Sequence, residues 1–356
     1  MRTYTIAVIA SLALGTTVAA GQVPAPPPAP QALRAPRMPR VEQPGHERGR
    51  VEEHDRKTLT VAGAAEIDLS NIAGDVIVMP GGGRDAIIEY TRRGFGDTPE
   101  EARRQLETID VTLTVTSDGR GTIRSRYTVP PGSRERNFRS SVDFRVTAPA
   151  HTHVRVKSIS GNVFASKMKG DLALESVSGN IRVDTSGSVS LAKTVSGDVE
   201  ISGLTAGESL TASSMSGTVT LRAIKARYLD LNSISGDIVV RDVACQRAEL
   251  QTISGSVEYA GAITRAGRYE LKAHSGDIRL AVTGGSGFDV EANSFSGRIR
   301  SDLPIKNEAL EEEDAMAGAG RARVRIPRRA TFRGTYKDGG AIIELTTFSG
   351  DIVITK

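Results

Sequence analysis

The sequence contains no tryptophan, one cysteine and only 4% aromatic residues. The single cysteine, Cys245, excludes an internal disulfide, and no neighbouring base marks it as a catalytic thiol, so we interpret it as a small core or turn residue. So few aromatic side chains beside 37 glycines favour a narrow core of small and β-branched residues. The formal net charge of +4 is modest for 356 residues, and we therefore expect no nucleic-acid partner.

Long hydrophobic runs are absent except at the N-terminus. There Met1-Arg2 precedes an apolar stretch through Val18, and Ala19-Ala20-Gly21 follows. This pattern predicts a signal peptide over residues 1–20 that is cleaved after Ala20, because the run is shorter than the roughly 20 residues that span a bilayer. We expect an exported protein in the periplasm, at the cell surface or outside the cell, with no transmembrane span after signal removal.

Residues 21–57 have the composition of a linker. The segment is rich in Pro and Ala up to Pro44, and a charged run from His46 to Lys57 follows. Such a composition cannot bury enough apolar surface to offset the entropy of ordering, so we expect residues 21–57 to be a disordered linker.

What the sequence has in abundance is one short phrase. It reads Ser-Ile-Ser-Gly-Asn-Val at Ser158–Val163, and it recurs so that seven of eight intervals between its glycines are 18 to 21 residues. A fixed period in this range is typical of stacked supersecondary units. The turn glycines of the phrase are Gly161, Gly179, Gly197, Gly217, Gly236, Gly255, Gly276, Gly297 and Gly350.

Each repeat reads as two short strands joined at a Ser-Gly turn, which predicts an all-β fold: a single-stranded β-solenoid, or β-helix, of about 19–20-residue coils. Coils would stack at the ~4.8 Å spacing of neighbouring strands. Glycine allows the tight corner, and the Asn or Asp after it can bond locally. Alternation places one apolar file inside: Val163, Ile181, Val199, Val219, Ile238, Val257, Ile278 and Ile299.

The remaining segments complete the expected domain organisation. Residues 58–150 form an N-terminal β-rich region with one short helix near 98–108, which Thr98-Pro99-Glu100 begins. The solenoid repeats follow over 151–300. The acidic and then basic stretch at 301–330 breaks the period and is expected to be a charged surface excursion. Residues 331–356 are expected to form a hairpin across Asp338-Gly339-Gly340 and then a C-terminal capping coil.

The repeat also carries a family resemblance. Ser176–Ile181 and the closing stretch Gly339–Ile352 are similar to the bacterial "putative adhesin" family, exported or envelope-associated β-strand-repeat proteins of unknown function. The resemblance covers roughly residues 59–356. It implies a β-solenoid and an envelope location, and it transfers no catalytic residue and no established activity.

One column of acidic residues is a candidate binding site. These side chains stand four residues before the apolar residue of the phrase, and stacking would turn them into an outward ladder of carboxylates at ~4.8 Å intervals. The ladder could bind divalent cations or a basic partner, or it could be a solvated face relieved by neighbours such as Lys272. Its members are Asp230, Glu249, Glu270, Glu291 and Glu344.

Other candidate sites have simpler explanations. The Asn/Asp column is interrupted by Thr218, Ser256 and Arg298, so turn chemistry explains it better than calcium binding. His151 and His153 share the spacing of one strand face, but no third zinc ligand accompanies them. His274 replaces an apolar residue of the phrase and is interpreted as a hydrogen-bonded turn residue, with a pH-sensitive site as the alternative. We expect no metal, no cofactor and no catalytic residue.

The sequence thus predicts an exported, non-catalytic envelope protein that acts as an adhesin-like binding or scaffolding surface. Its partner would be a glycan, an envelope component or a protein. Two alternatives stay open: a carbohydrate-active enzyme on the same scaffold, with carboxylates such as Glu200 and Glu258, and a regulatory partner in envelope stress.

Overall fold

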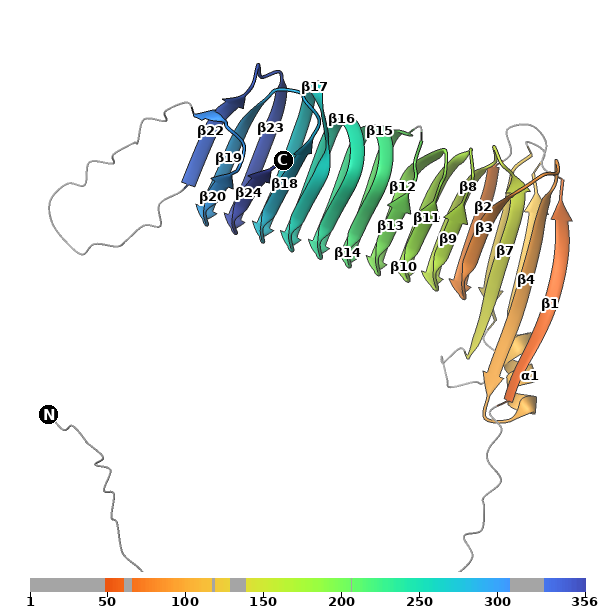
Figure 1. The fold of residues 1–356 in the computed structure, drawn as a ribbon. Coiled ribbons are helices and arrows are strands. Elements are labelled where there is room, and N and C mark those ends of the chain that lie inside the picture. Colours follow the sequence, from red (N-terminus) through yellow and green to blue (C-terminus); the bar gives the residue numbers. More distant parts are fainter. Residues whose placement is uncertain (1–48, 61–65, 117–118, 129–138, 206, 308–329) are drawn as a thin grey trace, which may run out of the picture. The chain divides into compact units, whose positions relative to one another are not determined.

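The computed structural model describes residues 49–60, 66–116, 119–128, 139–205, 207–307 and 330–356 (Figure 1). The predicted signal peptide, the predicted linker up to residue 48 and residues 308–329 of the predicted excursion lie outside the described residues. The described part is almost entirely β-strand, with one α-helix.

The strands form two walls that share three long strands. In spatial order, the first wall consists of β5 (Ile109–Val115), β6 (Gly121–Tyr127), β2 (Glu66–Ala73), β8 (His153–Ser160), β10 (Asp171–Ser178), β12 (Ser188–Ser196), β14 (Gly207–Ser216), the second halves of β15 (Val219–Ser235), β16 (Ile238–Ser254) and β17 (Val257–Ser275), β23 (Ala341–Ser349), β19 (Phe288–Ser296), β22 (Ala330–Tyr336) and β21 (Lys306–Asn307). The second wall consists of β1 (Gly49–Leu59), β4 (Ala86–Gly96), β7 (Ser140–Pro149), β3 (Val76–Gly81), β9 (Val163–Ser166), β11 (Ile181–Asp184), β13 (Val199–Ser202), the first halves of β15, β16 and β17, β18 (Ile278–Thr283), β24 (Ile352–Thr355) and β20 (Ile299–Ser301).

The predicted solenoid is confirmed, because neighbouring coils pair in parallel and in register. Val199 lies opposite Ile181 on one side and Val219 on the other. The predicted inward file is 0–1% exposed from Val163 through Ile278. Its last member, Ile299, is only partly buried, because its strand β20 is the last strand of the second wall and has a neighbour on one side alone.

The stack of coils begins earlier in the sequence than residue 151, the expected start. Strands β2 and β3 form its first coil, and they pair in parallel with β8 and β9, which lie more than 80 residues later. Helix α1 and strands β4 to β7 are inserted between this coil and the next. The expected boundary at residue 151 therefore divides coils that are neighbours in the fold.

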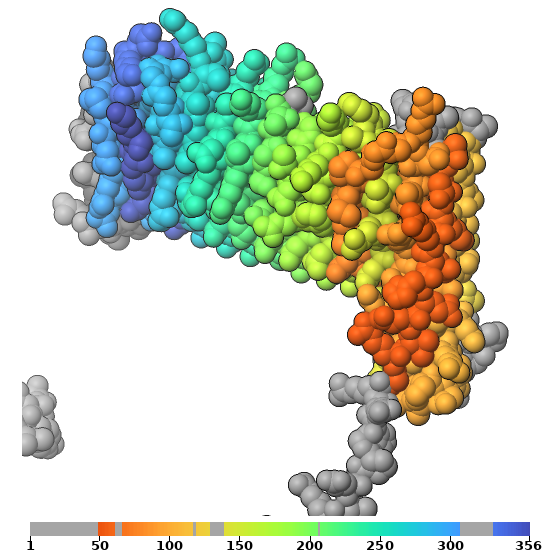
Figure 2. Space-filling view, turned by 45° about the vertical axis from the view of Figure 1, so that its right-hand side comes forward, coloured from red at the N-terminus to blue at the C-terminus, as the bar shows by residue number. Residues whose placement is uncertain are grey.

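The C-terminal hairpin and cap were predicted wrongly. Strand β22 pairs antiparallel with β19, whereas β23 pairs in parallel with both β17 and β19, so β19 lies between the two predicted hairpin strands. The last coil of the sequence is thus inserted before the coil of β19 and β20. Figure 1 shows β23 between β17 and β19, and in Figure 2 the darkest blue residues are flanked by lighter blue on both sides.

Residues 49–57 of the predicted linker are also a strand and not disordered. Strand β1 pairs antiparallel with β4 along its whole length, from Gly49 opposite Gly96 to Leu59 opposite Ala86. The charged side chains of β1 meet opposite charges across the strand pair, with Glu53 2.6 Å from Arg92 and Glu52 2.8 Å from Arg93. Composition alone missed this strand, because its order comes from a partner some 40 residues away.

The predicted helix is confirmed as α1 (Pro99–Glu107). Thr98 caps it, since its hydroxyl accepts a hydrogen bond from the Glu101 N–H at 3.2 Å. The helix packs directly on β4, where a Cβ at Gly94 would lie 2.1 Å from the carbonyl oxygen of Ala102. Glycine at this position therefore permits the close contact between helix and strand.

Candidate functional site

The Ser-Gly turn of the phrase is a hydrogen-bonded spine that holds one coil to the next. The Asn180 N–H donates to Oδ1 of Asn162 at 3.1 Å, and the Asp198 N–H donates to Oδ1 of Asn180 at 2.8 Å. At the other end, Oδ1 of Asp351 accepts from the Arg298 N–H at 2.8 Å. The Asn/Asp column is therefore occupied with backbone donors, as turn chemistry predicts. The described residues hold no cluster of three or more potential metal ligands.

The carboxylate ladder is brought together as predicted, but in a different order. Asp230 lies opposite Glu249, and Glu249 lies opposite Glu270. Glu344 is next, opposite Glu270 on one side and Glu291 on the other, because β23 is inserted before β19.

Each carboxylate of the ladder has a partner on its own wall. Lys272 binds Glu270, Arg268 lies 2.8 Å from Glu344 and Arg333 lies 2.8 Å from Glu291. The Asn232 amide donates to Asp230 at 2.6 Å and the Tyr228 hydroxyl to Glu249 at 3.2 Å. The hydrogen bond to Glu270, above all, raises the pKa of Lys272. These contacts relieve the repulsion between stacked carboxylates. Binding of cations or a basic partner by the ladder stays a prediction.

A second column of the first wall is exposed and apolar, and the sequence analysis did not identify it as a surface. It consists of the residue between the two hydroxyl residues of each phrase, and neighbouring coils bring its members side by side. Eight of its ten side chains are 37–53% exposed. We call this column the apolar row; in spatial order it contains Ile72, Ile159, Val177, Val195, Met215, Ile234, Ile253, His274, Phe348 and Phe295.

Alternation along each strand explains why the apolar row points outward. In β10, Leu172 and Leu174 are fully buried and Ser176 is 5% exposed, so Val177 must face solvent. The signal was present in the sequence, since counting in twos from the buried leucines reaches the serine and not the valine. Hydrophobicity suggested a core residue, and the strand phase decides otherwise.

The rings at one end of the apolar row stack on one another. Phe348 lies between His274, at 5.0 Å between centroids, and Phe295, at 4.7 Å, with interplanar angles of 12° and 6°. His274 is therefore a member of an aromatic stack, not the hydrogen-bonded turn residue expected from the sequence.

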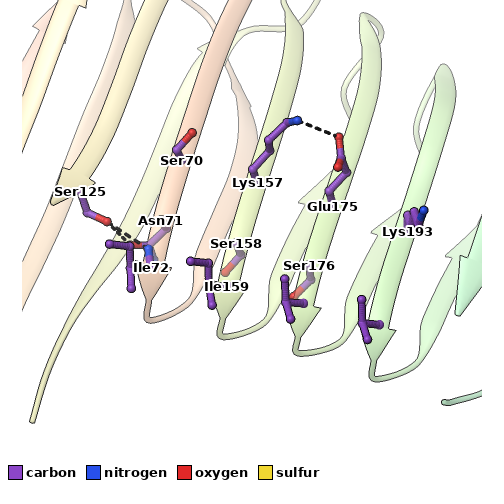
Figure 3. Close-up of a pocket in the computed structure, with 12 residues that line it drawn as sticks. Ser70, Asn71, Ile72, Ser125, Lys157, Ser158, Ile159, Glu175, Ser176 and Lys193 are labelled. Atoms are coloured by element: carbon purple, nitrogen blue, oxygen red, sulfur yellow. Dashed lines mark hydrogen bonds and ion pairs between the residues drawn. The ribbon is translucent and has the colours of Figure 1, made fainter. Parts of the chain in front are cut away.

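A groove opens at the other end of the apolar row, across β2, β8, β10 and β12. Its volume is about 400 Å³, and its apolar wall consists of Ile72, Ile159, Val177 and Val195. Lys157, Glu175 and Lys193 border it on the strand side (Figure 3). Lys157 lies 3.3 Å from Glu175, whereas Lys193 has no ion-pair partner among the described residues.

The groove interrupts a regular column of buried hydroxyls. Along most of the stack, this Ser or Thr donates to the glycine carbonyl of an adjacent coil, as Ser214 does to Gly197 at 2.9 Å and Thr252 to Gly236 at 3.0 Å. Ser158 and Ser176 line the groove and are 4% and 5% exposed, yet neither hydroxyl has a hydrogen-bond partner. The other buried polar atoms without a partner, on Arg92, Ser140 and Thr152, do not line the groove.

The remaining sequence candidates lie elsewhere. His151 and His153 are both exposed at the start of β8. Cys245 is 2% exposed, and its sulfur lies 3.6 Å from the Tyr259 hydroxyl. It is therefore a core residue, one of the two interpretations that the sequence allowed.

We expect the Cys245 thiol to resist modification in the folded protein. Burial raises its pKa to about 11, so at pH 8 only about one thiol in a thousand is the reactive thiolate. Reaction with a maleimide should be slow in buffer, faster as the pH rises towards 11, and rapid at pH 8 in guanidinium. Equal rates at pH 8 with and without denaturant would contradict the buried placement.

No helix in the part of the chain that the structure describes is long and apolar enough to cross a membrane. A profile of the family described as Toastrack DUF4097 matches residues 64–355. No curated protein matches the sequence.

Three solved structures are similar at low identity. A "putative adhesin" from Bacteroides fragilis is 14% identical, with 85% of this chain and 96% of that chain covered and a TM-score of 0.40. A "putative lipid binding protein" from Parabacteroides distasonis is 12% identical, with 65% and 90% covered and a TM-score of 0.44. A "putative cell adhesion protein" from Clostridium sporogenes is 8% identical, with 86% and 99% covered and a TM-score of 0.23. Similarities this remote carry no argument about function.

Proposed function

Because the family match covers residues 64–355, the chain belongs to the Toastrack DUF4097 family, and we propose that it is a non-catalytic, adhesin-like binding module of the cell envelope that holds a protein partner on its apolar row. The observation that carries the proposal is the exposure of eight large apolar side chains in one uninterrupted file. Monomeric soluble proteins rarely expose contiguous apolar surface on this scale without an interaction.

The dimensions of the apolar row suit a protein interface. Ten positions at about 4.8 Å give a length of about 43 Å. Eight side chains, each exposing nearly half of its surface, present roughly 600 Å² of mostly apolar area, close to the ~800 Å² that each partner buries in a standard interface. Polar residues such as Asn232 and Gln251 border the row, which matches the apolar centre and polar rim of protein interfaces.

The chemistry of the row favours a protein over a glycan or a bilayer. Most of its members are aliphatic, and the faces of Phe348 are covered by its two ring neighbours, so no aromatic face is free to stack on a sugar. The turn carboxylates Asp198, Asp237 and Asp277 follow row residues at a distance of three positions. They would repel the anionic surface of a membrane.

The absence of catalysis is part of the proposal. The outward carboxylates that an enzyme on this scaffold would need are engaged in surface contacts, such as Glu258 with Arg241 at 3.0 Å and Glu200 with Arg182 at 3.2 Å. Neither carboxylate lines the groove. Export to the envelope rests on the N-terminal sequence pattern and on the family resemblance.

Replacing Ile253 by aspartate should weaken binding to isolated cell envelopes by about 30-fold or more, the effect of losing an interface hot spot. The matched control is Ile342→Asp, because Ile342 is 47% exposed on the same wall but outside the apolar row, against 49% for Ile253. Saturable co-sedimentation of the purified chain with the envelopes measures the affinity. The control should bind like the wild type.

Pretreatment of the envelopes identifies the partner class. Protease digestion should abolish binding if the partner is a protein, whereas periodate oxidation should abolish it if the partner is a glycan. Release of soluble sugar above a heat-treated control would support the carbohydrate-active enzyme instead. Equal binding of both isoleucine variants would show that the apolar row is not the contact surface.

A further inference from the structure

We propose that the groove at the β2–β12 end of the apolar row is a binding site for a small anionic amphiphile, with an acyl chain along its apolar wall and the acidic head group beside Lys193. This site goes beyond the proposed function, since it concerns a small ligand at one end of the row and not a protein partner along its length. A volume of about 400 Å³ falls within the usual range of small-molecule sites.

The two unpartnered hydroxyls point to a ligand. Equivalent hydroxyls farther along the stack, on Thr194, Ser214 and Thr252, donate to a glycine carbonyl of an adjacent coil. At the groove this pattern fails: the Asn71 amide occupies the Gly74 carbonyl at 2.9 Å, and Ser158 is left without an acceptor. Buried polar groups are almost always satisfied, so two orphaned hydroxyls in one groove indicate a missing acceptor.

The charges around the groove favour an anion. Lys157 and Glu175 form an ion pair, so the Lys193 ammonium is the uncompensated charge at the border of the groove (Figure 3). In the two coils at its centre, the turn residues are the neutral Asn162 and Asn180, whereas Asp198, Asp237 and Asp277 stand at this position farther along. An acidic head group thus meets one free ammonium and weaker repulsion here than elsewhere on the row.

The apolar wall sets the other half of the ligand. Ile159, Val177 and Val195 are 37–53% exposed and follow one another on adjacent strands, so together with Ile72 they offer a continuous hydrocarbon surface about 14 Å long. That length suits an extended chain of about ten carbons. Neither the wall nor the hydroxyls offer the ordered backbone donors and acceptors with which a sheet edge binds a peptide strand.

Calorimetric titration of the purified chain with decanoate tests the proposal. Binding should saturate below the concentration at which decanoate aggregates, and it should tighten by about three- to four-fold per methylene from octanoate to dodecanoate. Decanol should bind at least about five-fold more weakly than decanoate in the wild type. Lys193→Gln should abolish this preference, and Lys272→Gln, on the same wall but far from the groove, should preserve it.

Two matched pairs of variants locate the site. Ile159→Gln should weaken binding by about ten-fold or more and Ile234→Gln should leave it unchanged, although both isoleucines belong to the apolar row and are about equally exposed. Ser176→Ala should weaken binding by about three-fold or more. Ser214→Ala, whose hydroxyl is already bonded, should not.

The source of the ligand is decided by comparing decanoate, decyl phosphate and phosphatidylglycerol vesicles. Competition between monomers and vesicles would identify a membrane head group, and binding of monomers alone a free amphiphile; both outcomes support the site. Three results would overturn it: no saturable binding of any of the three, equal losses in Ile159→Gln and Ile234→Gln, or a peptide with a C-terminal leucine that binds ten-fold tighter than decanoate. Because Ile253→Asp does not touch the groove, failure here is distinguishable from failure of the proposed protein interface.

Discussion

Replacing Gly161 by alanine is expected to destabilise the protein by about 3–5 kcal/mol, a large part of the 5–15 kcal/mol that stabilises a typical domain. Gly161 has a φ of +125°, which L-residues rarely adopt, and an added Cβ would lie 2.1 Å from the Gly74 carbonyl oxygen of the neighbouring coil. The methyl group would therefore both strain the turn and push two coils apart. Neither effect can relax locally, because Gly179 stacks on Gly161 in the same way from the other side.

Thermal unfolding measures this effect, and Gly82→Ala is the control. Gly82 lies in the turn after β3, its φ is not in the left-handed region, and an added Cβ there meets no atom within 4 Å. We expect a melting temperature roughly 6–15 °C lower for Gly161→Ala and no change for Gly82→Ala. A shift of less than 2 °C for Gly161→Ala would show that the turn tolerates a side chain and that the stacking of glycines is not what holds the coils in register.

Removing residues 341–356 should unfold β19 and β22, although both precede the cut. The deletion removes β23 and β24, whose side chains Ile343, Leu345, Ile352 and Ile354 are fully buried. Four such residues contribute on the order of 6–12 kcal/mol of burial. Strand β19 would then lose the strand that joins it to β17, and with it the connection to the rest of the first wall.

Hydrogen exchange of the amides in Phe288–Ser296 distinguishes this arrangement from a simple terminal cap. If the last coil of the sequence were also the last coil in space, truncation would leave β19 protected on β17. In the inserted arrangement, protection of β19 is lost. A pair of point variants repeats the test in the full chain: Leu345→Asp should be severely destabilising and Ile342→Asp nearly neutral, since the two side chains are 0% and 47% exposed.

The predictions from the repeat were accurate where physics is local or periodic. The phrase, its spacing and its glycines were enough to predict parallel coils, the inward file and the tight turn, because each depends on residues within one coil and its equivalents. Helix α1 was predicted for the same reason: Thr98, Pro99 and two acidic residues are signals confined to one turn of helix.

The predictions failed where contacts are distant in sequence. Strand β1 looked like a linker because its charges are neutralised by Arg92 and Arg93 on β4. The hairpin of β22 and β23 was expected because short connections usually join paired strands, yet β19 lies between them. The ladder residues were identified correctly, whereas their order, with Glu344 before Glu291, follows from an insertion that no local pattern records.

The sequence by itself determined the coil, since strand alternation, turn glycines and Asx residues act over distances of one repeat. Only the tertiary structure decided which coil lies beside which, because insertions at both ends of the stack separate neighbours in space by dozens of residues in the chain. It also decided the surface. Whether a column of isoleucines and valines is core or contact face depends on the phase of each strand relative to the stack, and whether a buried hydroxyl is satisfied depends on the adjacent coil. The apolar row and the groove with its two unpartnered serines therefore became visible only in the assembled fold.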